Sequence, residues 1–164
     1  YRSLAKATRR LRSGVLLAGM SFCYTSRMNE TRPLPAAALP PRVLLADDSA
    51  VCRVPAEVVL RDAGYRVDRV RDGRTAFDAA AMVRYGVILL ELALPRACGC
   101  EAARRIRGWE EAHGLPRVPI VAVTRDRARA DRERALAAGM DAFVTKPFRP
   151  GELLAAIGVV LDAE

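Results

Sequence analysis

The chain has 164 residues, which is enough for one domain of ordinary size plus a tail but not for two large domains. Hydrophobic residues make up 51% and charged residues 28%, which excludes a collagen-like or wholly disordered chain, and no apolar run reaches the roughly 18 residues of a membrane span. The net charge of +8 belongs mainly to residues 1–41, where seven basic residues stand against one acidic residue. Residues 42–164 hold twenty basic and eighteen acidic residues, so charge gives no reason to expect nucleic-acid binding by the body.

The amino-terminal arm, residues 1–41, differs from the rest of the chain. Three arginines precede a short apolar run at 14–20, in the order of a signal peptide, but no convincing cleavage site follows. Prolines and alanines then dominate residues 33–41, which predicts a stiff lead-in without a fold of its own. We favour a disordered arm or one translated from a false start, with Met20 or Met28 as the true start. A signal or anchor segment and a functional basic arm are the alternatives.

From residue 42 onward, short apolar runs alternate with helical patterns five times. The apolar runs are 43–46, 65–70, 87–90, 119–123 and 141–145. The helical stretches are 50–63, 73–84, 99–113, an Arg/Ala-rich segment that ends at 139, and 151–161. The third run is apolar at every position, which is typical of a central strand buried on both faces of a parallel sheet. The alternation predicts a doubly wound α/β domain with right-handed crossovers.

Three residues mark features of the first helix. Ser49 stands where its hydroxyl can cap the helix, and Gly64 stands where a glycine can end it. Pro55 lies about six residues into the same helix and removes one backbone hydrogen bond. We therefore expect either a kink at this proline or a helix that starts late.

Polar side chains follow four of the five predicted strands. Asp47 and Asp48 follow the first strand, Glu91 the third, Thr124 the fourth, and Lys146, the only lysine after residue 41, the fifth. Ligand sites of open parallel sheets lie beyond the carboxyl ends of the strands, so we expect these side chains to converge. Crowded carboxylates favour a hard cation such as Mg²⁺, and a lysine with a hydroxyl suits the oxygens of a phosphoryl group. The sequence therefore predicts an acidic pocket that handles phosphate and Mg²⁺.

These motifs resemble the receiver domain of two-component response regulators. The matching stretches are residues 43–49, 88–95, 119–124 and 138–148, and the resemblance covers about residues 42–162. The last two stretches are most similar to receivers attached to hybrid histidine kinases. The resemblance implies a five-stranded parallel sheet of flavodoxin-like order 2-1-3-4-5, with helices on both faces, in a receiver domain of residues 42–164.

The resemblance also implies roles for individual residues. In the family, an aspartate on the third strand takes a phosphoryl group from a phosphohistidine of a partner, and here that position holds Glu91. The other implied roles are metal ligation by Asp47, Asp48 and Glu91, switching by Thr124 and Phe143, and phosphate binding by Lys146 and Pro147. The family's Lys-Pro peptide bond is cis, so we expect a cis bond between Lys146 and Pro147.

Departures from the family pattern lie at the expected pocket. Glu91 is one methylene longer than aspartate, which moves its carboxylate by about 1 Å, and a misplacement of that size can cost roughly 100-fold in rate. Arg125 replaces a small residue next to Thr124, and Cys98 replaces the aspartate of an Asp-Gly pair. Charge alone favours an ion pair between Glu91 and Lys146. We therefore expect an atypical receiver that is not conventionally phosphorylated, in which Glu91 partly imitates the phosphorylated state.

Several alternatives remain beside this interpretation. Glu91 could be a drifted residue in an inert site, or the receiver could still be phosphorylated on Glu91. An Mg²⁺-dependent phosphatase-like enzyme would share the pocket, but such enzymes use an Asp-x-Asp motif that Asp47-Asp48-Ser49 does not supply. We expect a non-enzymatic signalling module. Cys98 and Cys100 could bind a metal or act in redox chemistry, although we favour reduced, unpaired thiols.

The expected partner is a histidine kinase or a histidine phosphotransfer protein. Receivers commonly use the last two helices and the strand between them for docking, and the same surface is expected here. We expect no nucleic-acid binding by this chain alone, no membrane association of the body, and a cytoplasmic location. Mg²⁺ binding is expected to be weakened by the altered site.

Overall fold

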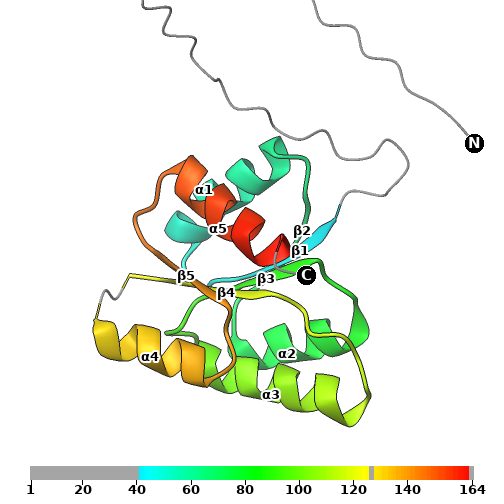
Figure 1. Ribbon diagram of the computed structural model, residues 1–164. Coiled ribbons are helices and arrows are strands. Elements are labelled where there is room, and N and C mark those ends of the chain that lie inside the picture. The colour runs from blue at the N-terminus through cyan, green and yellow to red at the C-terminus, as the bar shows by residue number, and fades with distance from the viewer. Residues whose placement is uncertain (1–40, 126–127, 163–164) are drawn as a thin grey trace, which may run out of the picture. The chain divides into compact units, whose positions relative to one another are not determined.

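The computed structural model describes residues 41–125 and 128–162 (Figure 1). The interpretations of the amino-terminal arm concern residues that, apart from Pro41, lie outside this part of the chain. Within it, strands alternate with helices in the order β1 (Arg42–Ala46), α1 (Ala50–Asp62), β2 (Arg66–Val70), α2 (Gly73–Met82), β3 (Val87–Leu90), α3 (Gly99–Ala112), β4 (Ile120–Thr124), α4 (Arg129–Ala137), β5 (Ala142–Thr145) and α5 (Pro150–Leu161). These bounds agree with the predicted ones to within a few residues at most element ends.

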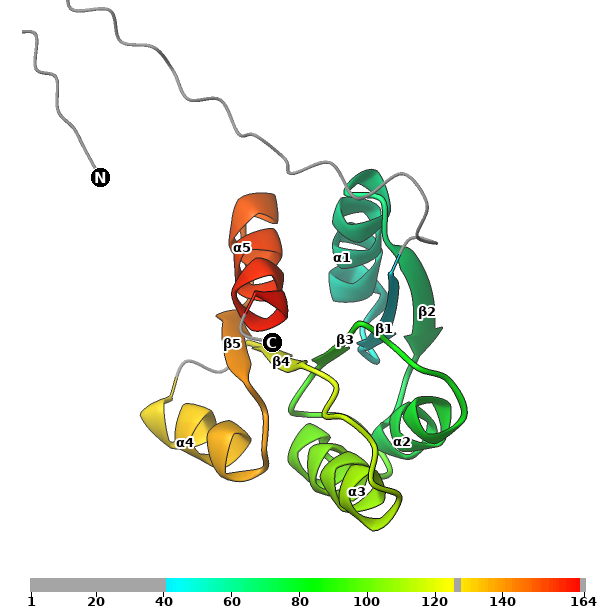
Figure 2. The same ribbon diagram turned by 45° about the vertical axis from the view of Figure 1, so that its right-hand side comes forward.

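The strands form one parallel sheet in the order β2-β1-β3-β4-β5, which confirms the predicted fold class. Helices α1 and α5 cover one face, and α2, α3 and α4 cover the other (Figures 1 and 2). Ala46 pairs with Leu90, and Thr124 pairs with Thr145, so the carboxyl ends of β1, β3, β4 and β5 lie at the same edge. This register brings the polar residues that follow those strands to one place.

Burial of both sheet faces explains the apolar strands. Every residue of β3 and β4 is buried, as the third apolar run predicts for a central strand. Alternate residues of each strand enter opposite cores: Leu90 packs with Ile106 of α3, whereas Leu89 packs with Leu60 of α1. Each such buried aliphatic side chain contributes about 1.5–3 kcal/mol. Strand β2 lies at the sheet edge and has no fully buried residue.

The structure corrects two expectations about the first helix. Ser49 occupies the N-cap position, but its side chain makes no capping hydrogen bond; its backbone N–H donates to Asp47 Oδ1 instead, at 2.9 Å. Helix α1 begins at Ala50 and contains Pro55, so a late helix start is wrong, while a kink stays a prediction. Gly64 has a φ of +86°, a left-handed conformation that favours glycine and ends the helix as predicted.

Gly99 fixes the approach of α3 to the end of β3. A Cβ atom at this residue would lie 2.2 Å from the carbonyl oxygen of Glu91, which is backbone and cannot swing away. The N–H of Gly99 also donates to the Leu92 carbonyl at 2.9 Å. The first turn of α3 therefore packs directly against the residue that ends β3.

The close approach at Gly99 can be tested with two substitutions in the same helix. We expect Gly99→Ala to lower the free energy of unfolding by about 1–3 kcal/mol, because the added methyl group overpacks the Glu91 carbonyl. Gly108→Ala, with nothing within 4 Å of the added Cβ, is the matched control and should raise stability by up to about 1 kcal/mol. Urea denaturation measures both changes. Equal effects of the two substitutions on stability would show that the first turn of α3 can accommodate a methyl group at Gly99.

Candidate functional site

Lys146 lies between two carboxylates at the carboxyl edge of the sheet. Its Nζ donates to Asp47 Oδ2 and to Glu91 Oε2, at 2.5 Å in each case. The exposed fractions are 2% for Asp47, 5% for Glu91 and 6% for Lys146, so the three groups are removed from water together. The ion pair between Glu91 and Lys146 that charge alone favours is present.

The charge of Lys146 is stabilised by its two partners. Burial on its own lowers the pKa of the ammonium, but the hydrogen bonds and the attraction from Asp47 and Glu91 outweigh burial and raise the pKa above its ordinary value. The lysine therefore stays protonated at neutral pH. One positive charge is shared between two negative charges, and neither carboxylate has this cation to itself.

The second oxygen of Glu91 is also engaged. Oε1 accepts hydrogen bonds from the backbone N–H of Leu92 at 2.8 Å and of Ala93 at 3.3 Å. With Lys146 on Oε2, both carboxylate oxygens have donors. Hydrogen bonds of this kind stabilise the charged carboxylate and make its lone pairs less available to an electrophile. Glu91 is thus held in place through both of its oxygens.

Asp47 is held from the side of α1. Its Oδ1 accepts the Ser49 N–H, and its carbonyl oxygen accepts a hydrogen bond from Arg53 Nη1 at 2.6 Å. Arg53 is only 6% exposed and was not among the predicted site residues. The signal in the sequence was its spacing, because Arg53 precedes the core residues Ala56 and Leu60 by three and seven positions and so shares their helix face.

A pocket of about 390 Å³ opens beside these three groups. It is lined by Asp48, Glu91, Ala93, Thr124 and Arg125. Asp48 and Arg125 are exposed, whereas Thr124 is buried. Arg125 therefore stands at the pocket, while the hydrogen bonds to Glu91 come from Lys146 and the backbone.

The predicted carboxylates do not form a ready metal site. Among residues 41–125 and 128–162, no three His, Cys, Asp or Glu side chains are spaced to hold one ion. Lys146 bridges Asp47 and Glu91, while Asp48 is exposed. The positive charge between Asp47 and Glu91 is thus the ammonium group of Lys146.

Two further predicted residues, Phe143 and Pro147, belong to β5 and to the loop that follows it. Phe143 pairs with Ala122 in the sheet register and is half-buried against the core on the α2–α4 face. The peptide bond between Lys146 and Pro147 is cis, which confirms the expectation. A second pocket, of about 420 Å³, lies next to this loop and is lined by Val51, Cys52, Pro55, Arg125, Lys146, Pro147 and Phe148.

This second pocket continues into an apolar stripe on α1. Val51, Val54 and Val58 are 84%, 52% and 51% exposed, which is high for large apolar side chains on a folded domain. Their spacing of three and four residues places them on one face of the helix. The sequence analysis did not single out this stripe, although the same spacing was its signal.

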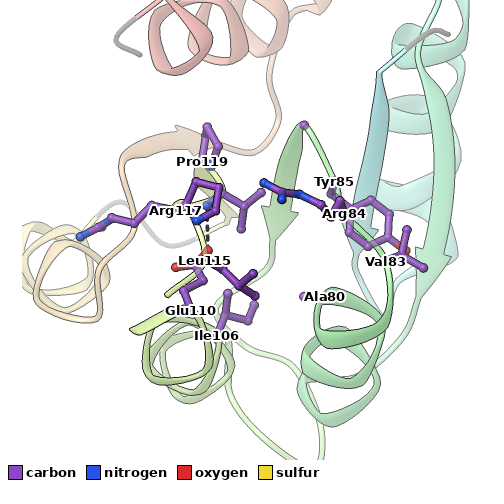
Figure 3. Close-up of a pocket in the computed structure, with 12 residues that line it drawn as sticks. Ala80, Val83, Arg84, Tyr85, Ile106, Glu110, Leu115, Arg117 and Pro119 are labelled. Carbon is purple, nitrogen blue, oxygen red and sulfur yellow. Dashed lines mark hydrogen bonds between the residues drawn. The ribbon is translucent and has the colours of Figure 1, made fainter. Parts of the chain in front are cut away.

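A third pocket lies at the opposite, amino-terminal edge of the sheet (Figure 3). It has a volume of about 210 Å³ and is lined by the ends of α2 and α3 and by the loops before β3 and β4. Its buried acid, Glu110, accepts hydrogen bonds from the Val118 N–H and from Arg107, both at 2.7 Å. These bonds tie a loop to α3, which is a structural role.

Comparison with known proteins identifies the family. Residues 43–158 match the model of the response regulator receiver domain. The sensor protein GacS of Pseudomonas syringae is 30% identical over 119 residues, which are 73% of this chain and 13% of GacS. The transcriptional regulatory protein PdtaR of Mycobacterium tuberculosis is 35% identical over 127 residues, which are 77% of this chain and 59% of PdtaR.

Solved receivers share the fold. The receiver domain of the sensor histidine kinase PA1611 from Pseudomonas aeruginosa, which has magnesium in its active-site cleft, is 37% identical with a TM-score of 0.68 and covers 75% of this chain and 98% of its own. The receiver domain of Ssk1 from Saccharomyces cerevisiae, solved with the phosphotransfer protein Ypd1, is 26% identical with a TM-score of 0.69 and covers 74% of this chain and 88% of its own.

The chain belongs to the response regulator receiver domain family of two-component signalling, and its relatives include the receivers of hybrid histidine kinases. It spans between 7% and 59% of the length of the first relatives it matches. Within the described part of the chain, no helix combines the length and the apolar character needed to cross a bilayer.

The bridge at Lys146 can be tested by removing its charge. We expect Lys146→Met to lower the free energy of unfolding by about 3–5 kcal/mol, because two buried carboxylates lose their shared cation. Arg125→Met, which removes an exposed cation at the same edge, is the matched control and should change stability by at most about 0.5 kcal/mol. Urea denaturation at neutral pH measures both. A small effect of the Lys146 substitution would contradict the bridge.

The wild-type chain and Lys146→Met should also differ in how their stability depends on pH. The pKa of Lys146 is raised in the folded state, so its contribution to stability is fully present below the ordinary lysine pKa of about 10.4 and is lost only as pH rises through the folded value. The stability difference between the wild-type chain and Lys146→Met should therefore stay constant from neutral pH to about pH 10 and shrink above it. Denaturation curves at stepped pH measure it. A difference that shrinks well below pH 10 would contradict the raised pKa.

Proposed function

We propose that this chain is an atypical receiver, with Glu91 at the phospho-acceptor position and without conventional phosphorylation. The observation that carries the proposal is the full engagement of Glu91, whose two oxygens accept hydrogen bonds from Lys146, Leu92 and Ala93. A carboxylate must present a free oxygen to attack a phosphorus atom. Glu91 is 5% exposed and has donors on both oxygens, so it is poorly placed as a nucleophile.

The same contacts support a role for Glu91 as a substitute for the signal. A negative group that extends beyond the end of β3 and binds Lys146 supplies part of the charge that an acyl phosphate would supply there. Thr124, buried beside the pocket, and Phe143, half-buried on β5, are the proposed switch residues that respond to this charge. Lys146 and Pro147 supply the phosphate-binding corner in this proposal. The receiver then stays in one signalling state.

Magnesium has a reduced part in this proposal. Lys146 lies between Asp47 and Glu91, and no three described side chains are spaced to hold one ion, so the three carboxylates would have to rearrange before they could bind Mg²⁺ together. Asp47, Asp48 and Glu91 are the proposed ligands of a weakly bound Mg²⁺. An ion would have to compete with the ammonium for the same oxygens, which is the reason for the weakness.

The proposed partner is a histidine kinase or a histidine phosphotransfer protein. We propose that a phosphotransfer protein docks on the apolar stripe of α1, because Val51 of the stripe also lines the apolar pocket, whose lining includes Lys146 and the Arg125 of the acidic pocket. A protein that brings a histidine to Glu91 must contact this surface. The surface on α4, β5 and α5 stays the predicted docking site for other partners.

The module acts as a protein-binding element rather than an enzyme, in the cytoplasm, where phosphohistidine partners of the family would meet it. No contact of the site favours the phosphatase alternative, because the nucleophile of such an enzyme would again be a carboxylate that lacks a free oxygen. Nucleic-acid binding is not part of the proposal, because the body of the chain is nearly neutral.

A direct test of the acceptor site uses acetyl phosphate and Mg²⁺. We expect the wild-type chain to remain unmodified by intact mass, because both oxygens of Glu91 are engaged. Glu91→Asp should take up one phosphoryl group per chain, since the shorter side chain leaves Lys146 and the backbone donors at a distance that frees an oxygen. Glu91→Gln is the control and should not react.

Two other outcomes have clear meanings. A stoichiometric, base-labile adduct on Glu91 of the wild-type chain would overturn the proposal of an atypical receiver. A failure of Glu91→Asp to react would instead place the obstruction at Arg125 or at Cys98.

The docking surface can be tested with three exposed valines. We expect Val51→Asp and Val58→Asp on α1 to weaken binding of a histidine phosphotransfer domain, selected for binding the wild-type chain, by about tenfold or more. Val159→Asp on α5, where the side chain is 69% exposed, is the control and should change binding little. Isothermal titration calorimetry measures the three dissociation constants. The reverse order of effects would favour the surface on the last two helices.

A further inference from the structure

Two cysteines that the proposed function does not use lie at the start of α3. Cys98 is the N-cap residue and is exposed, whereas Cys100 lies in the first turn and is half-buried. Both are free thiols, as is Cys52. The side chain of Cys98 makes no capping hydrogen bond, so it can turn toward another group without breaking one.

The Cα atoms of these two cysteines lie within the range that a disulfide spans, and the backbone of Cys98 decides whether the side chains can meet. Gly99, the residue between them, is the first helical residue of α3, and helix geometry then places the two Cα atoms about 5.4 Å apart. Disulfides usually join Cα atoms that are about 4.4–6.8 Å apart. Cys98 has an extended backbone with φ −65° and ψ 160°, so it stands outside the regular helix and can adjust to close the ring.

The surroundings of Cys100 are charged. Burial comes first and the neighbouring Cys98 second in raising the pKa of the Cys100 thiol, while Arg104 of α3 and Arg134 of α4 act to lower it. The two thiols and the two guanidinium groups are therefore close enough to interact. Helices α3 and α4 lie side by side on this face of the sheet (Figures 1 and 2). The net effect is a raised pKa, so the two arginines only partly offset the burial of the Cys100 thiol.

We propose that Cys98 and Cys100 form a reversible intrachain disulfide when the protein meets a hydroperoxide. The thiolate of exposed Cys98 attacks the peroxide, the O–O bond breaks, and after protonation a Cys98 sulfenic acid and an alcohol or water result. The Cys100 thiol then loses its proton and its sulfur attacks the Cys98 sulfur, the S–O bond breaks, and the departing hydroxide takes that proton and leaves as water. In sum, two thiols are oxidised to one disulfide and one peroxide is reduced.

Ring closure would act on the acceptor edge of the sheet. Gly99 lies inside the ring, and its Cα packs so closely on the Glu91 carbonyl that a Cβ atom would approach its oxygen to 2.2 Å. Any turn of the backbone at Gly99 disturbs this contact and the hydrogen bond from its N–H to Leu92. The dithiol is therefore a redox input to the loop that holds Glu91. This inference does not depend on whether Glu91 accepts a phosphoryl group.

Digestion with trypsin separates the two cysteines of the proposed disulfide from Cys52, so the disulfide can be detected by peptide mass. Peptide 97–104 contains both Cys98 and Cys100, whereas Cys52 falls in peptide 43–53. After treatment of the full chain with one equivalent of hydrogen peroxide and alkylation of the remaining thiols, we expect peptide 97–104 to be unalkylated and two hydrogen atoms lighter. Treatment with a reductant should restore its mass. Hydrogen exchange at the Gly99 amide should become faster in the oxidised protein.

Variants separate this disulfide from other oxidation. Cys52→Ser is the matched control and should form the light peptide as the wild-type chain does. Cys98→Ser and Cys100→Ser should both lose it. Cys100→Ser keeps the attacking thiol, so its Cys98 should be recovered as a sulfenic or higher oxide, whereas Cys98→Ser should leave Cys100 as an alkylated thiol. An unchanged peptide 97–104 in the oxidised wild-type chain would overturn the proposal. So would a disulfide that joins either cysteine to Cys52, to Cys23 or to a second copy of the chain.

Discussion

The acidic edge of this receiver depends on one buried ammonium group. Lys146 donates to Asp47 and Glu91 together, and without it two carboxylates would lie buried at the ends of adjacent strands with only mutual repulsion between them. The raised pKa of the lysine follows from this sharing. The strand register makes the sharing possible, because β1, β3 and β5 end at the same edge although they are distant in the sequence.

A lysine that already satisfies an acidic group has less to offer an incoming phosphoryl group. The length of Glu91 matters here, because the extra methylene lets one oxygen reach Lys146 while the other accepts from the backbone of its own loop. This arrangement is the basis of the proposal that the receiver stays in one signalling state. Under the proposed function, control comes from somewhere other than the acceptor carboxylate, and the two proposed routes are contacts with partners and the oxidation state of the thiols.

These two routes approach the same pocket from different helices. Helix α1 presents an apolar stripe that runs toward Lys146, and it also contributes Arg53, which holds the backbone of Asp47. Helix α3 begins with Cys98 and Gly99, and the glycine rests on the carbonyl of Glu91. A partner on the first helix and a disulfide on the third would thus each act on one of the two carboxylates that Lys146 joins.

Local patterns were sufficient for the fold. Apolar runs of strand length that alternate with helical patterns predicted the doubly wound sheet. The end of the first helix at Gly64 could also be predicted, because it depends on the backbone conformation of that one residue. The meeting of Glu91 and Lys146 could also be predicted, because the carboxyl ends of parallel strands lie at one edge of the sheet. The sequence alone did not predict that both oxygens of Glu91 would accept hydrogen bonds or that Arg53 would be buried against the backbone of Asp47. It also did not predict that the Ser49 side chain would make no capping hydrogen bond. Those outcomes depend on distances between atoms from separate elements, which arise only when the strands and helices pack together.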